Sequence, residues 1–188
     1  MVGDVMVDIL KDCIEIAEKR SRILDELDLK PKDYYLATVH RAENTDNFER
    51  MKNIVDALCD IGNVVFPCHP RTEKMLKKFG LWGSLREIKV INPVGYLDML
   101  MLEKNASKII TDSGGIQKEE YILKVPCITL RDTTEWVETV EDGWNVLVGA
   151  DKEKIIKTIN DFRFVGDQRN VFGNYASKKI VNIIGGIK

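Results

Sequence analysis

The sequence predicts an α/β fold: a doubly wound parallel sheet of Rossmann-like topology with helices on both faces. The first observation is alternation, because six short runs rich in β-branched or aromatic residues are separated by segments with helical spacing. The second is size, since 188 residues with 44% hydrophobic content can bury one sizeable core. Strands separated by helices join in parallel through right-handed crossovers. We therefore expect one domain over residues 1–188.

The predicted helices carry apolar residues at intervals of three and four. In the first helix this stripe begins at Val5 and Met6 and continues less regularly to Leu27. Gly80 closes the third helix, and two consecutive glycines open the fifth. The predicted helical ranges are 4–27, 48–61, 70–80, 96–105, a segment that starts at 114, 151–162 and about 175–184.

The predicted strands are short and rich in residues that favour extended structure. YYLATV, at positions 34–39, is the first of them. The predicted ranges are 34–39, 63–66, 88–91, 107–111, 125–130 and 145–148.

Charge and hydropathy exclude several functional classes. The formal net charge of −2, from 28 basic and 30 acidic side chains, leaves no broad basic face for nucleic acid. The apolar runs are too short to span a membrane, and the first residues, MVGDVMVDILKD, carry acids where a signal peptide carries basic residues. We expect a cytoplasmic protein that binds neither nucleic acid nor a membrane.

Four cysteines lie far apart in the sequence. Cys13, Cys59, Cys68 and Cys127 show no CxxC spacing, which argues against a disulfide framework and against a zinc site. We expect no metal and no cofactor.

Candidate functional residues follow four of the predicted strands. His40 and Arg41 follow the first strand, His69 the second, the double glycine the fourth and Arg131 the fifth. Open parallel sheets bind ligands beyond the carboxyl ends of their strands, near the point where the strand order reverses. We expect the binding site on this rim. Solvation explains some of its polar character, but it explains less well why both histidines of the protein lie there.

The double glycine opens a helix where glycine is unfavourable. Each glycine in a helix costs roughly 1 kcal/mol relative to alanine. If Ser113 caps this helix, the N–H groups of Gly114, Gly115 and Ile116 point outward, and the missing side chains let a phosphate approach them. The sequence therefore predicts an anion cradle, with a tight strand-to-helix turn as the alternative.

Two glutamates follow in the same helix. Glu119 and Glu120 either complement the helix dipole and face solvent, or one of them accepts hydrogen bonds from the hydroxyls of a ribose. Together with the cradle and the rim arginines, the second interpretation predicts a nucleoside diphosphate or its sugar conjugate as ligand.

Five motifs of this chain match one family. They are HRAEN at 40–44, FPCHPRT at 66–72, VGYLDML at 94–100, TDSGGIQKEE at 111–120 and LRDTTEWVETVEDGWNVLVG at 130–149. Together they resemble the carboxyl-terminal half of UDP-N-acetylglucosamine 2-epimerases. The resemblance implies one half of a glycosyltransferase-B-like enzyme, in which the sugar nucleotide lies between two Rossmann-like halves.

The resemblance also implies a reaction. Members of the family are isomerases of polysaccharide biosynthesis that interconvert UDP-N-acetylglucosamine and UDP-N-acetylmannosamine. They remove the C2 proton, expel UDP to give a glycal, and re-add UDP with the opposite configuration at C2. Hydrolysing relatives release N-acetylmannosamine instead.

Roles for individual residues follow from the same resemblance. Ser113, Gly114 and Gly115 would bind the diphosphate, and Glu119 the ribose. His40 would lie against the phosphates or the reacting sugar as a catalytic residue. Arg41 and His69 match positions that contact a second, activating sugar nucleotide in some bacterial members, and Arg131 is expected to contact substrate from the rim.

The chain departs from the family pattern in two respects. Met99 stands where many members have an aromatic residue that stacks on uracil, although a thioether also packs on a ring face. The family is about twice as long, and the carboxylates assigned to proton transfer belong to its amino-terminal half. We therefore expect an isolated half that lacks its amino-terminal domain, binds UDP weakly and is inactive alone, from a homodimeric parent protein.

Two other functions fit the same residues. One is a sugar-nucleotide glycosyltransferase of the same fold. The other is a nucleotide-binding regulatory module that works alone.

Overall fold

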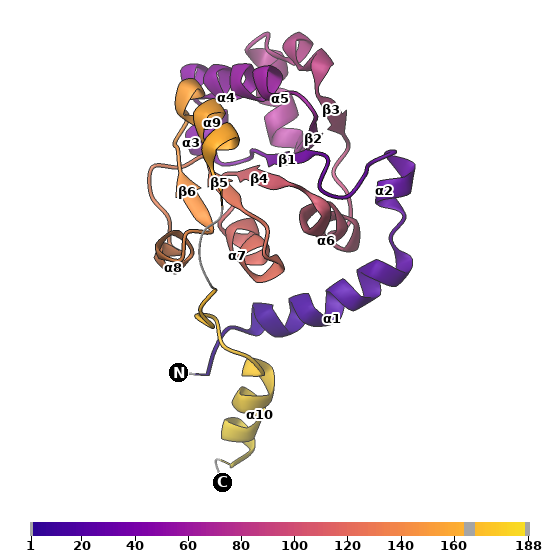
Figure 1. Ribbon diagram of the computed structural model, residues 1–188, viewed down its shortest axis with the longest axis vertical. Helices are drawn as coiled ribbons and strands as arrows, with labels where there is room; N and C mark the ends of the chain where they lie inside the picture. The colour runs from indigo at the N-terminus through magenta and orange to yellow at the C-terminus, as the bar shows by residue number, and fades with distance from the viewer. Residues whose placement is uncertain (1, 164–167, 187–188) are drawn as a thin grey trace.

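The computed structural model describes residues 2–163 and 168–186. Its centre is a parallel sheet with the strand order β3-β2-β1-β4-β5-β6, so the direction of strand addition reverses between β1 and β4 (Figure 1). The predicted fold class and all six predicted strands are confirmed. The strands are β1 Tyr35–Thr38, β2 Val64–Pro67, β3 Lys89–Ile91, β4 Lys108–Thr111, β5 Cys127–Thr129 and β6 Asn145–Leu147.

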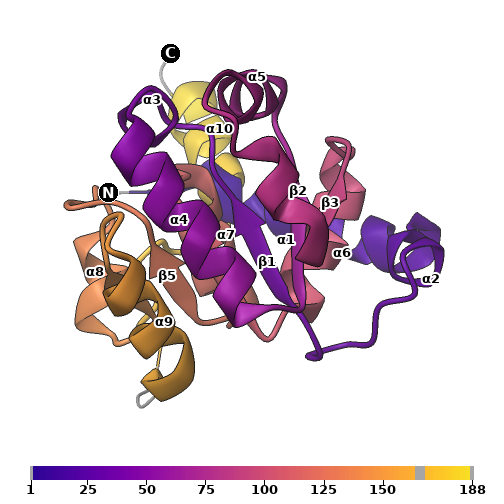
Figure 2. The same cartoon turned by 90° about the horizontal axis from the view of Figure 1, so that it is seen from above.

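Both faces of the sheet are covered by helices, as the apolar content of the strands requires. Successive strand side chains point to opposite faces, so Leu36 and Ile109 belong to one core cluster while Ala37 and Ile110 belong to the other. Figure 2 looks down on the first of these faces, which buries Ala37 and Ile110 and on which α4 lies across the sheet beside α9. This face carries α4 Phe48–Ile61, α5 Pro70–Lys78, the 3-10 helix η1 Trp82–Glu87 and α9 Lys152–Asp161.

The second face carries α6 Tyr96–Asn105 and α7 Gly114–Leu123, with α1 Val5–Arg20 and α2 Ile23–Glu26 outside them (Figure 1). The predicted single helix over 4–27 is wrong, because it breaks at Ser21. This residue has extended backbone angles, φ −70° and ψ 141°. Its hydroxyl donates a hydrogen bond to Asp98 Oδ1 at 2.6 Å and accepts one from the Ile23 N–H.

Three short helical segments lie where the sequence indicated only loops. They are α3 Ala42–Thr45, η1 and α8 Val137–Glu141. The final predicted helix is confirmed as α10 Ala176–Gly186.

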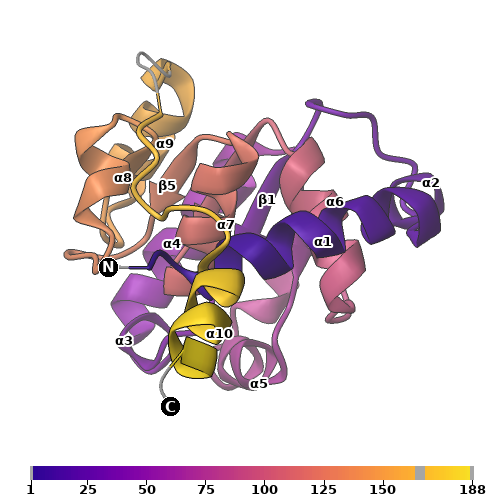
Figure 3. The same cartoon turned by 90° about the horizontal axis from the view of Figure 1, so that it is seen from below.

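Two distant segments cross beside the amino terminus of α1. The Asp4 N–H donates to the Phe172 carbonyl at 2.8 Å, and Gly3 and Gly173 both have positive φ, at 101° and 72°. A Cβ on Gly173 would lie 3.0 Å from the Gly3 Cα, so side chains are excluded where the backbones meet. From this crossing α10 projects away from the sheet (Figure 1). Seen from below, it lies in front, beside the start of α1 (Figure 3).

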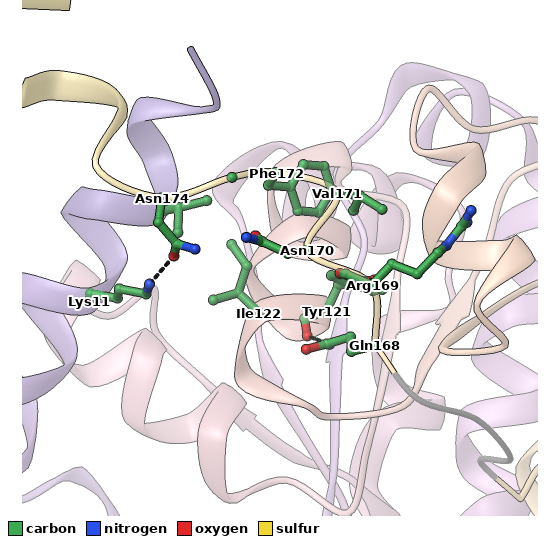
Figure 4. Close-up of a pocket in the computed structure, with 11 residues that line it drawn as sticks. Lys11, Tyr121, Ile122, Gln168, Arg169, Asn170, Val171, Phe172 and Asn174 are labelled. Atoms are coloured by element: carbon green, nitrogen blue, oxygen red, sulfur yellow. Dashed lines mark hydrogen bonds between the residues drawn. The ribbon is translucent and has the colours of Figure 1, made fainter. Parts of the chain in front are cut away.

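A cavity of about 210 Å³ lies between α1, α7 and segment 168–174 (Figure 4). Lys11 donates a hydrogen bond to Asn174 across one side of it. Among the described residues, no helix is both long enough and apolar enough to cross a membrane.

Candidate functional site

The ends of β1 and β4 lie side by side where the strand order reverses, and Asp112 links them. The Thr38 and Thr111 hydroxyls are hydrogen bonded at 2.6 Å across the two strands. One residue further, the fully buried Asp112 accepts the backbone N–H groups of His40 and Arg41 at 3.0–3.2 Å and the side-chain amide of Asn44 at 3.0 Å. Burial alone would raise the pKa of Asp112, but hydrogen bonds from His40, Asn44 and Arg41 outweigh it and lower this pKa.

The His40 side chain is oriented by the same carboxylate. Its Nδ1 lies 3.1 Å from Asp112 Oδ1, and 42% of the side chain is exposed. Because the carboxylate accepts the Nδ1 proton, Nε2 is left to bind or exchange a proton at the rim. Asp112 was not singled out from the sequence. Its position directly after the fourth predicted strand, 107–111, was the available signal.

The helix start at Ser113 has the predicted cap. Ser113 is extended, with φ −81° and ψ 122°, and its hydroxyl accepts the Ile116 N–H at 3.4 Å. The prediction that the Ile116 N–H points outward is therefore wrong, because Ser113 uses it. The N–H groups of Gly114 and Gly115 belong to the first turn, where a helix offers them no carbonyl acceptor.

The fold itself does not require glycine at either position. A Cβ on Gly115 would meet only the Ser113 hydroxyl, at 3.7 Å, and a Cβ on Gly114 would approach its nearest neighbours to 3.5 Å. Both distances are ordinary van der Waals contacts, and neither glycine has positive φ. The structure therefore favours the anion cradle (residues 113–115) over the tight turn.

Two arginines from different strand ends meet beside the cradle. Arg131 makes a bidentate pair with Glu135, at 2.6 and 3.0 Å, and Arg41 Nη2 lies 3.7 Å from the same carboxylate. The hydrogen bond from Arg131 lowers the pKa of Glu135 to about 2. Gly114 lies next to this group, because a Cβ added to it would be 3.5 Å from both Arg41 Nη2 and Glu135 Oε2. Cationic side chains thus reach the positive end of α7.

An apolar slot adjoins the start of α7, because Ile116 is one of the residues that line it. Its volume is about 220 Å³, and it is lined in part by His40, His69, Pro93, Val94, Met99 and Ile116. Met99 is therefore open to the slot, where the family resemblance predicts contact with a base. His69 has a further, structural role, because its Nδ1 accepts the Arg71 N–H at 3.1 Å and caps α5. The two histidine rings lie 6.1 Å apart.

Three carboxyl groups of α6 and α7 are buried, namely Glu103, Glu119 and Glu120. Glu119 is 7% exposed and accepts a hydrogen bond from the Tyr96 hydroxyl at 2.8 Å. Glu120 on α7 and Glu103 on α6 are fully buried. Within the described structure, neither carboxylate oxygen of Glu103 has a hydrogen-bond partner. Burial, with Glu119 nearby, raises the pKa of both Glu103 and Glu120 well above the usual range. A solvent-facing Glu120 is therefore excluded, and neither Glu103 nor Tyr96 was singled out from the sequence.

No group of three or more His, Cys, Asp or Glu side chains in residues 2–163 and 168–186 is arranged to hold a metal ion. The four cysteines are free thiols.

Comparison with known proteins identifies the family. The family model for UDP-N-acetylglucosamine 2-epimerase matches residues 1–185. A UDP-N-acetylglucosamine 2-epimerase homolog of Methanococcus maripaludis is 52% identical over 97% of this chain and 53% of its own length. The UDP-N-acetylglucosamine 2-epimerase of Methanocaldococcus jannaschii is 49% identical over 98% of this chain and 54% of its own length.

Solved structures agree with the sequence relatives. The crystal structure of the M. jannaschii UDP-GlcNAc 2-epimerase in complex with UDP-GlcNAc and UDP matches with a TM-score of 0.89 and 48% identity, over 98% of this chain and 54% of that one. The enzyme from Neisseria meningitidis bound to UDP-GlcNAc matches with a TM-score of 0.83 and 27% identity, over 98% and 54%. The chain thus spans about half the length of these relatives. The resemblance seen in the five motifs is confirmed, and the chain belongs to the UDP-N-acetylglucosamine 2-epimerase family.

Proposed function

We propose that residues 1–188 form one Rossmann-like UDP-binding domain of a UDP-N-acetylglucosamine 2-epimerase. The complete enzyme would interconvert UDP-N-acetylglucosamine and UDP-N-acetylmannosamine. The observation that carries this proposal is the glycine pair at the start of α7, which the fold does not require. Gly114 lies near Arg41, and the residue after the pair, Ile116, lines an apolar slot. A relative of nearly half-identical sequence has UDP-GlcNAc and UDP bound.

The proposed ligand fits the geometry of the rim. The diphosphate would accept hydrogen bonds from the N–H groups of Gly114 and Gly115 and from the Ser113 hydroxyl, with the dipole of α7 behind them. Arg41 and Arg131 would supply positive charge.

The nucleoside would extend from the cradle along α6 and α7. Glu119, held by the Tyr96 hydroxyl, would accept the ribose hydroxyls. Uracil would enter the apolar slot against Met99, while His69, at the start of α5, lines the same slot.

In the proposed reaction, this domain stabilises the departing UDP. Elimination breaks the bond between C1 of the sugar and the diphosphate oxygen, so negative charge develops on the diphosphate. Preorganised N–H groups and arginines aimed at that charge lower the barrier. His40 Nε2, oriented by the contact of Nδ1 with Asp112, would exchange a proton with the phosphate or the sugar. The groups that take and return the C2 proton would come from the amino-terminal half.

The complete protein is proposed to act in the cytoplasm as a homodimer. The four free cysteines of this chain suit a reducing compartment, and light scattering of the complete protein tests the dimer.

The test follows the C2 proton. The 188-residue chain and the complete protein are each incubated with UDP-N-acetylglucosamine in deuterated water, with UDP release and C2 exchange read by NMR. We expect weak UDP binding and no exchange for the chain, and epimerisation for the complete protein. Exchange of the C2 proton by the 188-residue chain would contradict the proposal that this chain holds only part of the active site. Transfer of the sugar to an acceptor would indicate a glycosyltransferase, and UDP binding without turnover by the complete protein would indicate a binding module.

A further inference from the structure

Trp136 joins the start of α7 to parts of the chain outside the proposed ligand contacts. Its indole Nε1–H donates a hydrogen bond to the Gly114 carbonyl at 2.7 Å. Its backbone is fixed on both sides, because its N–H donates to Thr134 Oγ1 at 3.0 Å and its carbonyl accepts the Thr139 hydroxyl at 2.7 Å. The indole is therefore held in place independently of any ligand.

The hydrogen bond to Gly114 helps to hold the direction of the next N–H in the first turn of α7. The Gly114 carbonyl and the Gly115 N–H belong to one planar peptide unit, in which they point in opposite directions. Glycines on both sides of this peptide allow rotations that other residues would resist. A donor that fixes the carbonyl therefore also fixes the N–H, and polarises it toward an acceptor on the far side.

The indole ring is clamped against the same helix. Lys118 lies one turn after Gly114, and its Nζ is 4.2 Å from the centroid of the Trp136 ring. Lys118 is only 8% exposed and also forms an ion pair with Asp4. Phe172 packs edge-on against the indole, with ring centroids 5.7 Å apart and an interplanar angle of 81°.

We infer that Trp136 is a positioning residue, which aims the Gly115 N–H at the diphosphate by holding the Gly114 carbonyl. This inference rests on the proposed function, since it assumes that a diphosphate binds at the cradle. Asp4 and Phe172 belong to the two segments that cross at Gly3 and Gly173, so the aim of the cradle also depends on that crossing.

The test replaces Trp136 by Phe, which keeps a ring for Lys118 and removes the indole donor. Loss of one oriented donor predicts an about three- to tenfold weaker affinity for UDP. Affinity for uridine, which lacks phosphate, should be unchanged. Trp82→Phe is the matched control, because Trp82 also carries a lysine over its ring, with Lys77 Nζ at 5.1 Å, but lies on η1.

Three results would overturn the inference. A folded Trp136→Phe variant with wild-type affinity for UDP would show that the indole donor is irrelevant. Equal losses for UDP and uridine would show a general structural effect. Absence of UDP binding by the wild-type protein would overturn the proposed function itself, and with it this inference.

A measurement on the wild-type protein covers a variant that fails to fold. During UDP titration, the NMR resonances of the Gly115 amide and the Trp136 indole N–H should shift along one saturation curve. A Gly115 amide that responds while the indole does not would contradict the coupling.

Discussion

Replacing Gly115 by alanine should stabilise the protein while weakening its affinity for UDP. The added Cβ would meet only the Ser113 hydroxyl, at 3.7 Å, and the residue already has helical geometry without positive φ. Alanine is favoured over glycine in a helix by about 1 kcal/mol, and we expect roughly half to all of that near a helix end. A gain of that size raises Tm by about 1–4 °C in a chain of this length.

The same methyl group would occupy the space in which we propose that a phosphate binds. Hydrogen bonds to a charged group contribute about 1.5–3 kcal/mol each. Loss or lengthening of one such bond predicts an about 10- to 100-fold weaker affinity for UDP. The larger Gly115→Val change should abolish binding. Stability and affinity therefore move in opposite directions, which a general folding defect cannot produce.

Calorimetric titration with UDP and thermal unfolding measure the two quantities on the same variant. Gly83→Ala is the control, because Gly83 lies in η1, also without positive φ, and a Cβ there would meet nothing within 4 Å. That variant should keep wild-type affinity. Unchanged affinity in folded Gly115→Ala would remove the anion cradle, and a lower Tm would favour the tight turn.

Three further predictions concern polar groups. His40→Ala in the complete protein should lower turnover by about 100-fold or more with little change in stability, and normal turnover would assign His40 to the solvated rim. Asp112→Asn should lower the free energy of unfolding by about 2–4 kcal/mol at pH 7, because a carboxylate with four donors is lost. Since the pKa of Asp112 is lowered in the fold, this difference should shrink as pH falls through that pKa; a difference that stays constant down to acid pH would contradict the ionised carboxylate. Burial raises the pKa of the Glu120 carboxyl in the folded state. The contribution of this group to the free energy of unfolding is therefore fully present below its unfolded-state pKa. It is lost as pH rises toward the folded-state pKa, at about 1.4 kcal/mol per pH unit. Glu120→Gln cannot ionise and should gain stability relative to wild type over that window in chemical denaturation, and parallel pH profiles would show that Glu120 is ionised in the fold.

The elements that sequence predicted well are those determined by local pattern. The six strands follow from short β-branched runs, and the Ser113 cap follows from a serine placed just before helical spacing. The break at Ser21 could not be predicted in this way, because the hydroxyl that stabilises it reaches Asp98, 77 residues away in the chain.

The site shows the same limit. Rim residues were identified because parallel strands bring their carboxyl ends together. The burial of Glu120 depends on packing against other elements, including α6, whose Glu103 is buried close to it. The residue pattern within α7 cannot predict that packing. No local pattern predicts the contact made by Trp136, because its indole N–H donates a hydrogen bond to a carbonyl 22 residues earlier in the chain.

The reversal of strand order between β1 and β4 also has a kinetic consequence. Thr38 and Thr111 pair across 73 residues of chain, and His40 pairs with Asp112 across 72. Closing so long a loop has an entropy cost that must be met before any contact across it forms, which slows folding of sheets that depend on such contacts. Tyr35 of β1 pairs with Val64 of β2 across 29 residues (64 − 35), so this pairing has a smaller closure cost. Because His40 and Ser113 come together only when the long loop has closed, recovery of UDP binding during refolding reports the joining of the two halves of the sheet, while helix content reports earlier events.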